Sequence, residues 1–310
     1  MNLAVRELSV PVVRAFVWTA REKESEAIRR RRALRRFDNE LEKGNYKAAH
    51  SLLKQLQHKP RGLLGFGSVK LVVPKRIPTQ ELHMDNSASF ESLADSILRS
   101  IKHSIEFARV DEDVLLTGIE DSMGSENYDP PYEDHQMCLQ EVHFLQHEAG
   151  HFLVGYLVGV LPRSYQVPNV EDIIHDKFAQ GNVQFLGFEF LKQVDIDTIS
   201  SKKFTQGKEI RANISSRTLN KFLCVILGGL VAEHLVFGYS ELLHSDVQQL
   251  DRVLRWLCFN ENEADSVIRW AVITTLSLLC HHHGARSRLA EAMNSRRSIG
   301  YCIDAIESAL

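Results

Sequence analysis

The stretch EVHFLQHEAGHFLVGYLVG, residues 141–159, carries the pattern on which the expected architecture of this chain depends. It passes from polar residues into a long apolar run, which is typical of a helix that lies largely inside a protein. His147 and His151 are four residues apart, and this spacing on a helix places both imidazoles on one face. Glu148 directly follows the first histidine. The stretch therefore predicts a helix that presents two potential metal ligands and one carboxylate to the same side.

The apolar neighbours of this pattern favour a functional role for it. They are Val142, Leu145, Phe152, Leu153, Tyr156 and Leu157. Burying two histidines and a glutamate without partners costs about 1–3 kcal/mol for each unsatisfied group. The alternative is an ordinary core helix whose polar groups satisfy one another. We favour the metal site, because His-Glu-x-x-His brings two ligands and a base together.

A catalytic zinc site needs a third protein ligand and an open position for water. The downstream residues that can complete the site are Glu233, His234, His244, Asp246 and Asp251. Carboxylate and imidazole both bind zinc well. Residue chemistry alone therefore leaves the choice of the third ligand open.

Two separate segments resemble one known family. QHEAGHFLVGYLVG, residues 146–159, resembles the His-Glu-Ala-Gly-His helix of FtsH-type zinc metallopeptidases. LGGLVAEHLVFGYSELLHSDVQQLDRVL, residues 227–254, resembles their later Gly-Gly-x-x-Ala-Glu-x-Leu helix and the aspartate-containing segment that follows it. The two matches occur in the family's order, and the resemblance covers roughly residues 138–310.

The resemblance implies roles for five residues. His147, His151 and Asp246 would bind Zn²⁺, and Glu148 would be the general base. Glu233 would support a ligand through a hydrogen bond, and its direct coordination as the third ligand is the alternative. The resemblance thus implies a zinc-dependent metalloendopeptidase, which hydrolyses peptide bonds with a metal-activated water.

The chain also departs from the family pattern. Leu230 and His234 stand where the family usually has arginine and glutamate, and Ser245 precedes Asp246 in place of asparagine. No G-x-x-x-x-G-K-[ST] loop is present in the sequence, so this chain carries no ATPase of that type. The resemblance is therefore to stand-alone FtsH-peptidase-like proteins of plants and cyanobacteria, which implies a chloroplast location.

Two other classes of protein compete with the peptidase as interpretations of the sequence. The first is a non-proteolytic, zinc-stabilised scaffold or assembly factor that keeps the peptidase fold, and the intact His-Glu-x-x-His pattern favours the enzyme over it. The second is an intramembrane metalloprotease, which needs several membrane-spanning helices. No uninterrupted apolar run in the sequence reaches the roughly 18–20 residues of a span. We therefore expect at most peripheral membrane association.

Composition limits the expected partners. The chain has 310 residues, a formal net charge of −3 and five cysteines without a C-x-x-C pair. This charge favours no nucleic-acid partner, and the cysteine pattern indicates neither a disulfide framework nor a cysteine-rich zinc module. The run of arginines from Arg29 to Arg36 is balanced by nearby acids and is read as a solvated helix face. The resemblance to FtsH-type peptidases implies, as partners, protein or peptide substrates, a separate ATPase or FtsH-type protein, and further copies of this chain.

The apolar periodicity predicts a mainly α fold with three parts. Residues 1–60 would form a helical hairpin that turns at Gly44-Asn45, and residues 61–87, rich in Gly and Pro, would be a linker. Residues 88–310 would form a helical domain with a strand-containing insert at about 164–210, and the family resemblance implies that this domain has a zincin-like FtsH-peptidase fold. In that insert GNVQFLGFEFL, residues 181–191, is the best strand candidate. Expected helices of the third part are 90–108, 138–161, 216–238, 245–258, 262–282 and 286–308, and an acidic surface loop is expected at 111–136.

Overall fold

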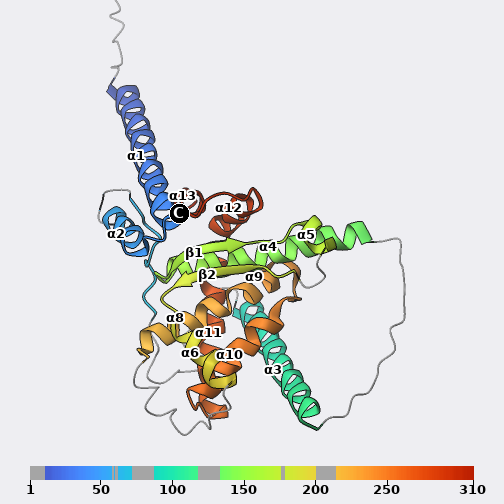
Figure 1. Ribbon diagram of the computed structural model, residues 1–310. Coiled ribbons are helices and arrows are strands. Elements are labelled where there is room, and N and C mark those ends of the chain that lie inside the picture. The colour runs from blue at the N-terminus through green and yellow to red at the C-terminus, as the bar shows by residue number, and fades with distance from the viewer. Residues whose placement is uncertain are drawn as a thin grey trace, which may run out of the picture.

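The computed structural model describes residues 11–57, 59, 62–71, 87–117, 133–175, 179–199 and 214–310. Within these ranges helices dominate, and the one sheet has two strands (Figure 1). The expectation of a mainly α chain is thus confirmed.

The helices and strands have the following bounds. In chain order they are α1 Pro11–Glu42, α2 Tyr46–Gln57, α3 Ser87–Thr117, α4 Glu133–Leu157, β1 Leu161–Gln166, α5 Val170–His175, β2 Asn182–Leu186, α6 Phe190–Ile199, α8 Ser216–Ile226, α9 Gly228–Phe237, α10 Leu243–Trp256, α11 Glu261–His281, α12 His283–Asn294 and α13 Ile299–Glu307. Their buried apolar side chains form one contiguous core.

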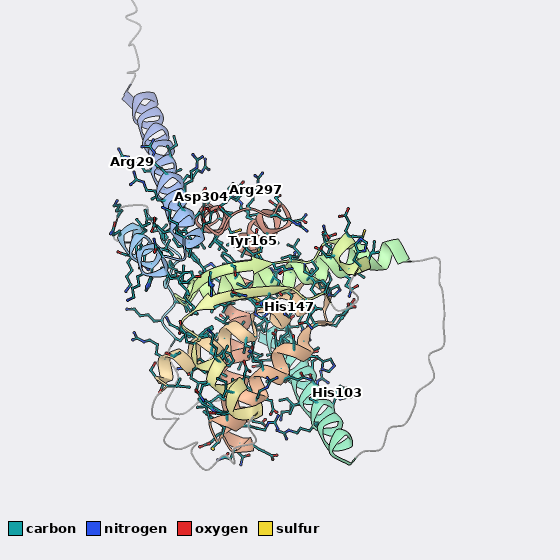
Figure 2. All side chains as sticks on the ribbon, in the orientation of Figure 1. Arg29, His103, His147, Tyr165, Arg297 and Asp304 are labelled. Carbon is teal, nitrogen blue, oxygen red and sulfur yellow. The ribbon has the colours of Figure 1, made fainter. Side chains whose placement is uncertain are left out.

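Helices α1 and α2 form the expected N-terminal hairpin. Gly44 in the turn has a φ of +75°, a left-handed conformation that glycine adopts without steric cost. The hairpin packs against α13 (Figure 1). Arg30 and Arg31 pair with the two oxygens of Asp304 at 2.7 and 2.8 Å, and Asp304 lies where α13 meets α1 in Figure 2. Two arginines of the predicted solvated face therefore help to dock the hairpin.

The described part of the predicted linker packs against the core. Leu63 and Phe66 are buried. The backbone N–H groups of Leu64 and Gly65 donate to the Glu307 carboxylate, each over 2.7 Å. This segment is therefore tied to the last helix of the chain.

Helices α4 and α9 lie side by side at the centre of the molecule (Figure 1). The two backbones come close together at Gly150 and Gly228. A Cβ on Gly150 would lie 2.3 Å from the carbonyl oxygen of Gly228, a distance at which no side chain fits. The missing side chains therefore let the two backbones pack closely and bring residues of α9 next to the histidines of α4.

The predicted loop at 111–136 was wrong at both ends. Helix α3 continues to Thr117 and α4 already begins at Glu133, while residues 118–132 lie outside the described part. The acidic composition of this region does not prevent a helix, because the helix propensities of Glu and Asp lie within the range of ordinary residues.

Two predicted helices are each divided. The predicted helix 216–238 is broken at Leu227 into α8 and α9. The predicted helix 286–308 is split into α12 and α13 by a turn in which Arg296 has a φ of +49°. Ser298 then caps α13 by accepting the N–H of Tyr301, and such a cap favours a new helix start.

The structure contains one strand, β1, that the sequence pattern did not predict. Helix α4 ends at Leu157 and not at 161, Gly159 turns the chain with a φ of +74°, and β1 follows. Strand β1 pairs antiparallel with β2, from Leu161 opposite Leu186 to Gln166 opposite Asn182. The strand predicted within 181–191 is thus confirmed as β2. Residues 200–213 of the predicted insert lie outside the described part.

Among the described residues, the stretch Ser216–Phe237 is long and apolar enough to cross a bilayer by length and composition. Of its most apolar window, 72% is buried inside the protein. Buried core helices meet the same criterion.

Candidate metal centre

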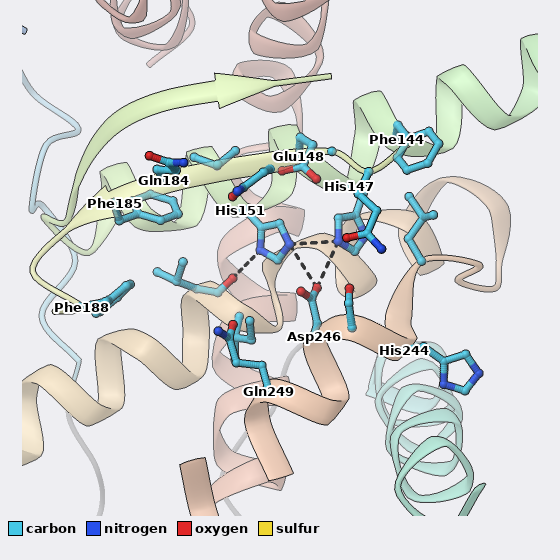
Figure 3. A pocket seen from close by; sticks show the side chains of 18 of the residues that line it. Phe144, His147, Glu148, His151, Gln184, Phe185, Phe188, His244, Asp246 and Gln249 are labelled. Atoms are coloured by element: carbon cyan, nitrogen blue, oxygen red, sulfur yellow. Dashed lines mark hydrogen bonds and ion pairs between the residues drawn. The ribbon is translucent and has the colours of Figure 1, made fainter. Parts of the chain in front are cut away.

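Three elements bring the predicted site residues together. Helix α4 supplies His147, Glu148 and His151, α9 supplies Glu233, and the first turn of α10 supplies Asp246. The close α4–α9 packing places Glu233 behind the histidines, and α10 presents Asp246 from the opposite side. Figure 3 shows His147, His151 and Asp246 converging beneath β2.

The three predicted ligands meet at one point. The Nε2 atoms of His147 and His151 are 2.9 Å apart. Asp246 Oδ2 lies 3.0 Å from the first and 3.1 Å from the second. One ligand atom from each residue lies within 4.8 Å of the others, a grouping able to hold a metal ion.

The hydrogen bonds of the two Nδ1 atoms indicate which tautomer each ring has when it is neutral. His151 Nδ1 lies 2.7 Å from the carbonyl oxygen of Val225, which can only accept, so Nδ1 is the donor. His147 Nδ1 likewise lies 2.5 Å from Glu233 Oε1. In the neutral rings both Nε2 atoms therefore carry lone pairs directed at Asp246. Metal-binding histidines are held by such acceptors on the opposite nitrogen.

The electrostatics of the cluster fit a bound cation. Burial alone would raise the pKa of Asp246, but the adjacent imidazoles of His151 and His147 outweigh it and lower that pKa well below its usual range. Burial alone would lower the pKa of His147, yet the neighbouring Asp246 and Glu233 carboxylates raise it well above its usual value. Asp246 Oδ2 is buried and accepts no hydrogen bond of good geometry from the described residues. A cation between these atoms would satisfy all three.

Glu148 faces the same space but does not belong to the ligand group. Its side chain is buried, and burial raises its pKa to about 7. Its Oε2 atom has no hydrogen-bond partner among the described residues. A Cβ on Gly181 would lie 2.4 Å from the other oxygen, Oε1, so the loop before β2 covers the carboxylate closely. A carboxylate with this pKa can both accept and return a proton near neutral pH.

An open cleft of about 680 Å³ runs past these groups. Its described lining includes the two histidines, Glu148 and Asp246, together with β2 and the start of α10. Apolar side chains line one part of it, among them Phe144, Phe185, Phe188, Leu191 and Phe222. The site is thus accessible to a ligand from the molecular surface.

The other candidate third ligands point elsewhere. His234 Nδ1 contacts the carbonyl of Leu230 at 2.8 Å, His244 Nδ1 contacts Ser104 Oγ at 2.9 Å, and Asp251 pairs with Arg109 and Arg255. Glu233 contacts Nδ1 of His147 and not Nε2, which is the supporting position. Of the five candidates, Asp246 alone joins the ligand group found in the described residues.

Sequence reasoning missed one buried polar residue beside the centre. His143 is fully buried and its Nδ1 lies 3.2 Å from Glu233 Oε2. The available signal was its position four residues before His147, which places it on the same face of α4. Conversely, Val142 was expected inside but is exposed.

Glu233, which contacts both His143 and His147, stays charged although it is buried. Burial alone would raise the pKa of Glu233, but hydrogen bonding to His147 and to the backbone N–H of Glu241 brings it below the usual value. Glu233 is therefore ionised and accepts from every partner.

No protein-family model, no curated protein and no solved structure matches this chain.

Proposed function

We propose that this protein is a zinc-dependent metalloendopeptidase with a zincin-like, FtsH-peptidase-type fold. The observation that carries the proposal is the convergence of His147 Nε2, His151 Nε2 and Asp246 Oδ2 on one point, with the buried Glu148 carboxylate beside it. Two imidazoles and one carboxylate are the donor set of several catalytic zinc sites. The resemblance of the two sequence segments to FtsH-type peptidases supports the same assignment.

The chain's own residues account for most of the proposed chemistry. His147, His151 and Asp246 would hold the ion, while Glu233 and the Val225 carbonyl keep the two rings oriented. Zinc bound there would act as a Lewis acid toward a peptide carbonyl and would ease deprotonation of the attacking water. Glu148 would take that proton and pass it to the leaving amine. The cleft would hold the peptide chain during the reaction.

The experiment compares zinc content and peptide hydrolysis in wild type, Glu148→Gln and Glu141→Gln. Glu141 lies two turns earlier on the same helix and serves as the matched control. We expect one zinc per chain in all three proteins. Hydrolysis of casein or a quenched peptide should fall by about 10²–10⁴-fold in Glu148→Gln alone, the usual contribution of a general base. Full hydrolysis by Glu148→Gln would overturn the assigned base.

The same experiment separates the peptidase from the scaffold alternative. A zinc-stabilised scaffold would bind stoichiometric zinc in all three proteins and would hydrolyse no peptide in any of them. The docked hairpin α1–α2 would then be the natural candidate for partner recruitment.

The proposal extends to the surroundings of the enzyme. Its substrates would be proteins or peptides, and a separate ATPase or FtsH-type partner would deliver unfolded chains to the cleft. We propose a chloroplast location on the same family resemblance, and assembly with further copies of this chain as an open alternative to a monomer.

A further inference from the structure

His143 is a histidine in the protein interior that the proposed reaction does not use. It lies on α4, one helical turn before His147, and its side chain is fully buried. Its ring stacks on Phe237 with centroids 3.8 Å apart and an interplanar angle of 23°. Its Nδ1 atom lies 3.2 Å from Glu233 Oε2. It is not one of the ligand group at the candidate metal centre, and its polar contact with the site is with Glu233.

Glu233 connects two parts of the site through its two oxygens. Oε1 contacts His147 Nδ1 at 2.5 Å. Oε2 accepts the backbone N–H of Glu241 at 2.8 Å and, more weakly, that of Leu242 at 3.5 Å. Leu242 immediately precedes α10, the helix whose first turn carries Asp246. One carboxylate thus contacts a predicted ligand directly and anchors the chain segment that leads to another.

His143 is the side chain that fixes the second oxygen of this carboxylate. An ionised carboxylate only accepts hydrogen bonds, so Glu233 Oε2 is the acceptor in its contact with His143 Nδ1, as it is toward the backbone N–H groups. Among the described residues, no other side chain donates to Oε2. Without the His143 donor, the carboxylate group would be held at Oε2 by main-chain contacts alone and would rotate more freely about its terminal torsion.

We propose that His143 is a positioning residue, which donates from Nδ1 to Glu233 Oε2 and thereby fixes both the His147 ring and the backbone that leads to Asp246. This inference rests on the proposed metal function for its effect on zinc affinity. Its structural part, the orientation of Glu233, does not depend on a metal. The competing explanation is that His143 serves as an aromatic packing residue against Phe237.

Two substitutions separate these explanations. His143→Asn keeps an N–H donor near the position of Nδ1 and loses the ring. His143→Phe keeps a ring that can stack on Phe237 and loses the donor. If His143 positions Glu233, the Asn variant should behave like wild type and the Phe variant should not.

The first readout is the dissociation constant for zinc, measured by competition with a chelator of known affinity. We expect His143→Phe to weaken zinc binding by about 10–100-fold, the range found for partners of metal-binding histidines. His143→Asn should stay within a few-fold of wild type. Wild-type affinity in the Phe variant together with a loss in the Asn variant would overturn the proposal in favour of packing.

The second readout needs no metal and no substitution. In the metal-free wild-type protein, nuclear magnetic resonance of the imidazole nitrogens should show a proton on Nδ1 of His143, and the amide of Glu241 should be protected from hydrogen exchange. An unprotonated Nδ1 would overturn the proposal even if both variants fail to fold. If wild type binds no zinc while Nδ1 is protonated and the Glu241 amide is protected, the peptidase function fails and the positioning role stands.

Discussion

The Nε2 atoms of His147 and His151 lie 2.9 Å apart, while their Nδ1 atoms are held by two different acceptors. The two rings therefore cannot turn away from each other without breaking a buried hydrogen bond, which costs about 1–3 kcal/mol when an acceptor or donor is left unsatisfied. When both imidazoles are neutral, the lone pairs of the two Nε2 atoms repel each other and the Asp246 carboxylate. A proton or a metal ion between these atoms removes that repulsion.

Replacing the carboxylate should abolish metal binding while the fold is kept. The amide of Asp246→Asn can donate to the Nε2 atoms that now lie near Oδ2, so the protein should remain folded. Its zinc affinity should fall more than 100-fold, because loss of a supporting partner alone already costs about 10–100-fold. Zinc content after dialysis checks this, with the exposed Asp265→Asn as control. Unchanged zinc content in Asp246→Asn would remove this residue from the centre.

Zinc binding should release protons at neutral pH. The carboxylates of Asp246 and Glu233 raise the pKa of His147 against the effect of burial, so the metal-free centre retains a proton that zinc must displace. The apparent affinity should therefore fall as pH is lowered, since protons compete for the same Nε2 atoms. Calorimetric titration in buffers of different ionisation enthalpy measures the protons released. A binding enthalpy that is independent of the buffer at pH 7 would contradict this prediction.

Two glycine-to-alanine substitutions should differ in their effect on zinc affinity. At Gly229 a Cβ would lie 2.4 Å from His147 Nε2, so Gly229→Ala should displace the ring and weaken zinc binding. At Gly284, in α12, a Cβ would meet nothing within 4 Å. Gly284→Ala should leave zinc binding unchanged and stabilise the protein by about 0.4–1 kcal/mol, because the unfolded chain loses conformational freedom. Chelator competition and urea unfolding test the pair, and equal zinc affinities for the two variants would be incompatible with the described geometry.

The buried hydrogen bond between Tyr156 of α4 and Glu307 of α13 should contribute to stability. Tyr156 donates to Glu307 Oε1 over 2.6 Å, and both side chains are buried. Tyr156→Phe should lower the free energy of unfolding by about 1.5–3 kcal/mol, the usual value for a hydrogen bond to a charged group. The exposed Tyr301→Phe is the control and should change it by less than about 0.5 kcal/mol. Equal effects of the two substitutions in urea unfolding would argue against this hydrogen bond.

The sequence allowed part of the site to be predicted. The four-residue spacing of His147 and His151 places both rings on one face of any helix, so their pairing could be expected without a structure. The choice of Asp246 depended on family resemblance, because the path of the chain between α4 and α10 cannot be derived from local pattern. His143 escaped notice because its partner, Glu233, is 90 residues away.

The same distinction applies to the fold. Long apolar-periodic helices were predicted because burial of one face repeats along the sequence. The break at Leu227 and the strand β1 were not, since the apolar pattern runs on past Leu227 and β1 forms by pairing with a later segment, β2. Likewise, Arg30 and Arg31 dock α1 through Asp304, which is 274 and 273 residues away in the sequence. Their local sequence alone indicated a solvated surface.

The most direct test of the central claim is a crystal structure of the zinc-loaded protein with anomalous data at the zinc edge. The geometry predicts one peak within about 2.0–2.2 Å of His147 Nε2, His151 Nε2 and an oxygen of Asp246, the usual zinc–ligand distances, on the side that faces Glu148. An anomalous peak at coordination distance from Glu233, or one stoichiometric zinc away from these three residues, would contradict the claim.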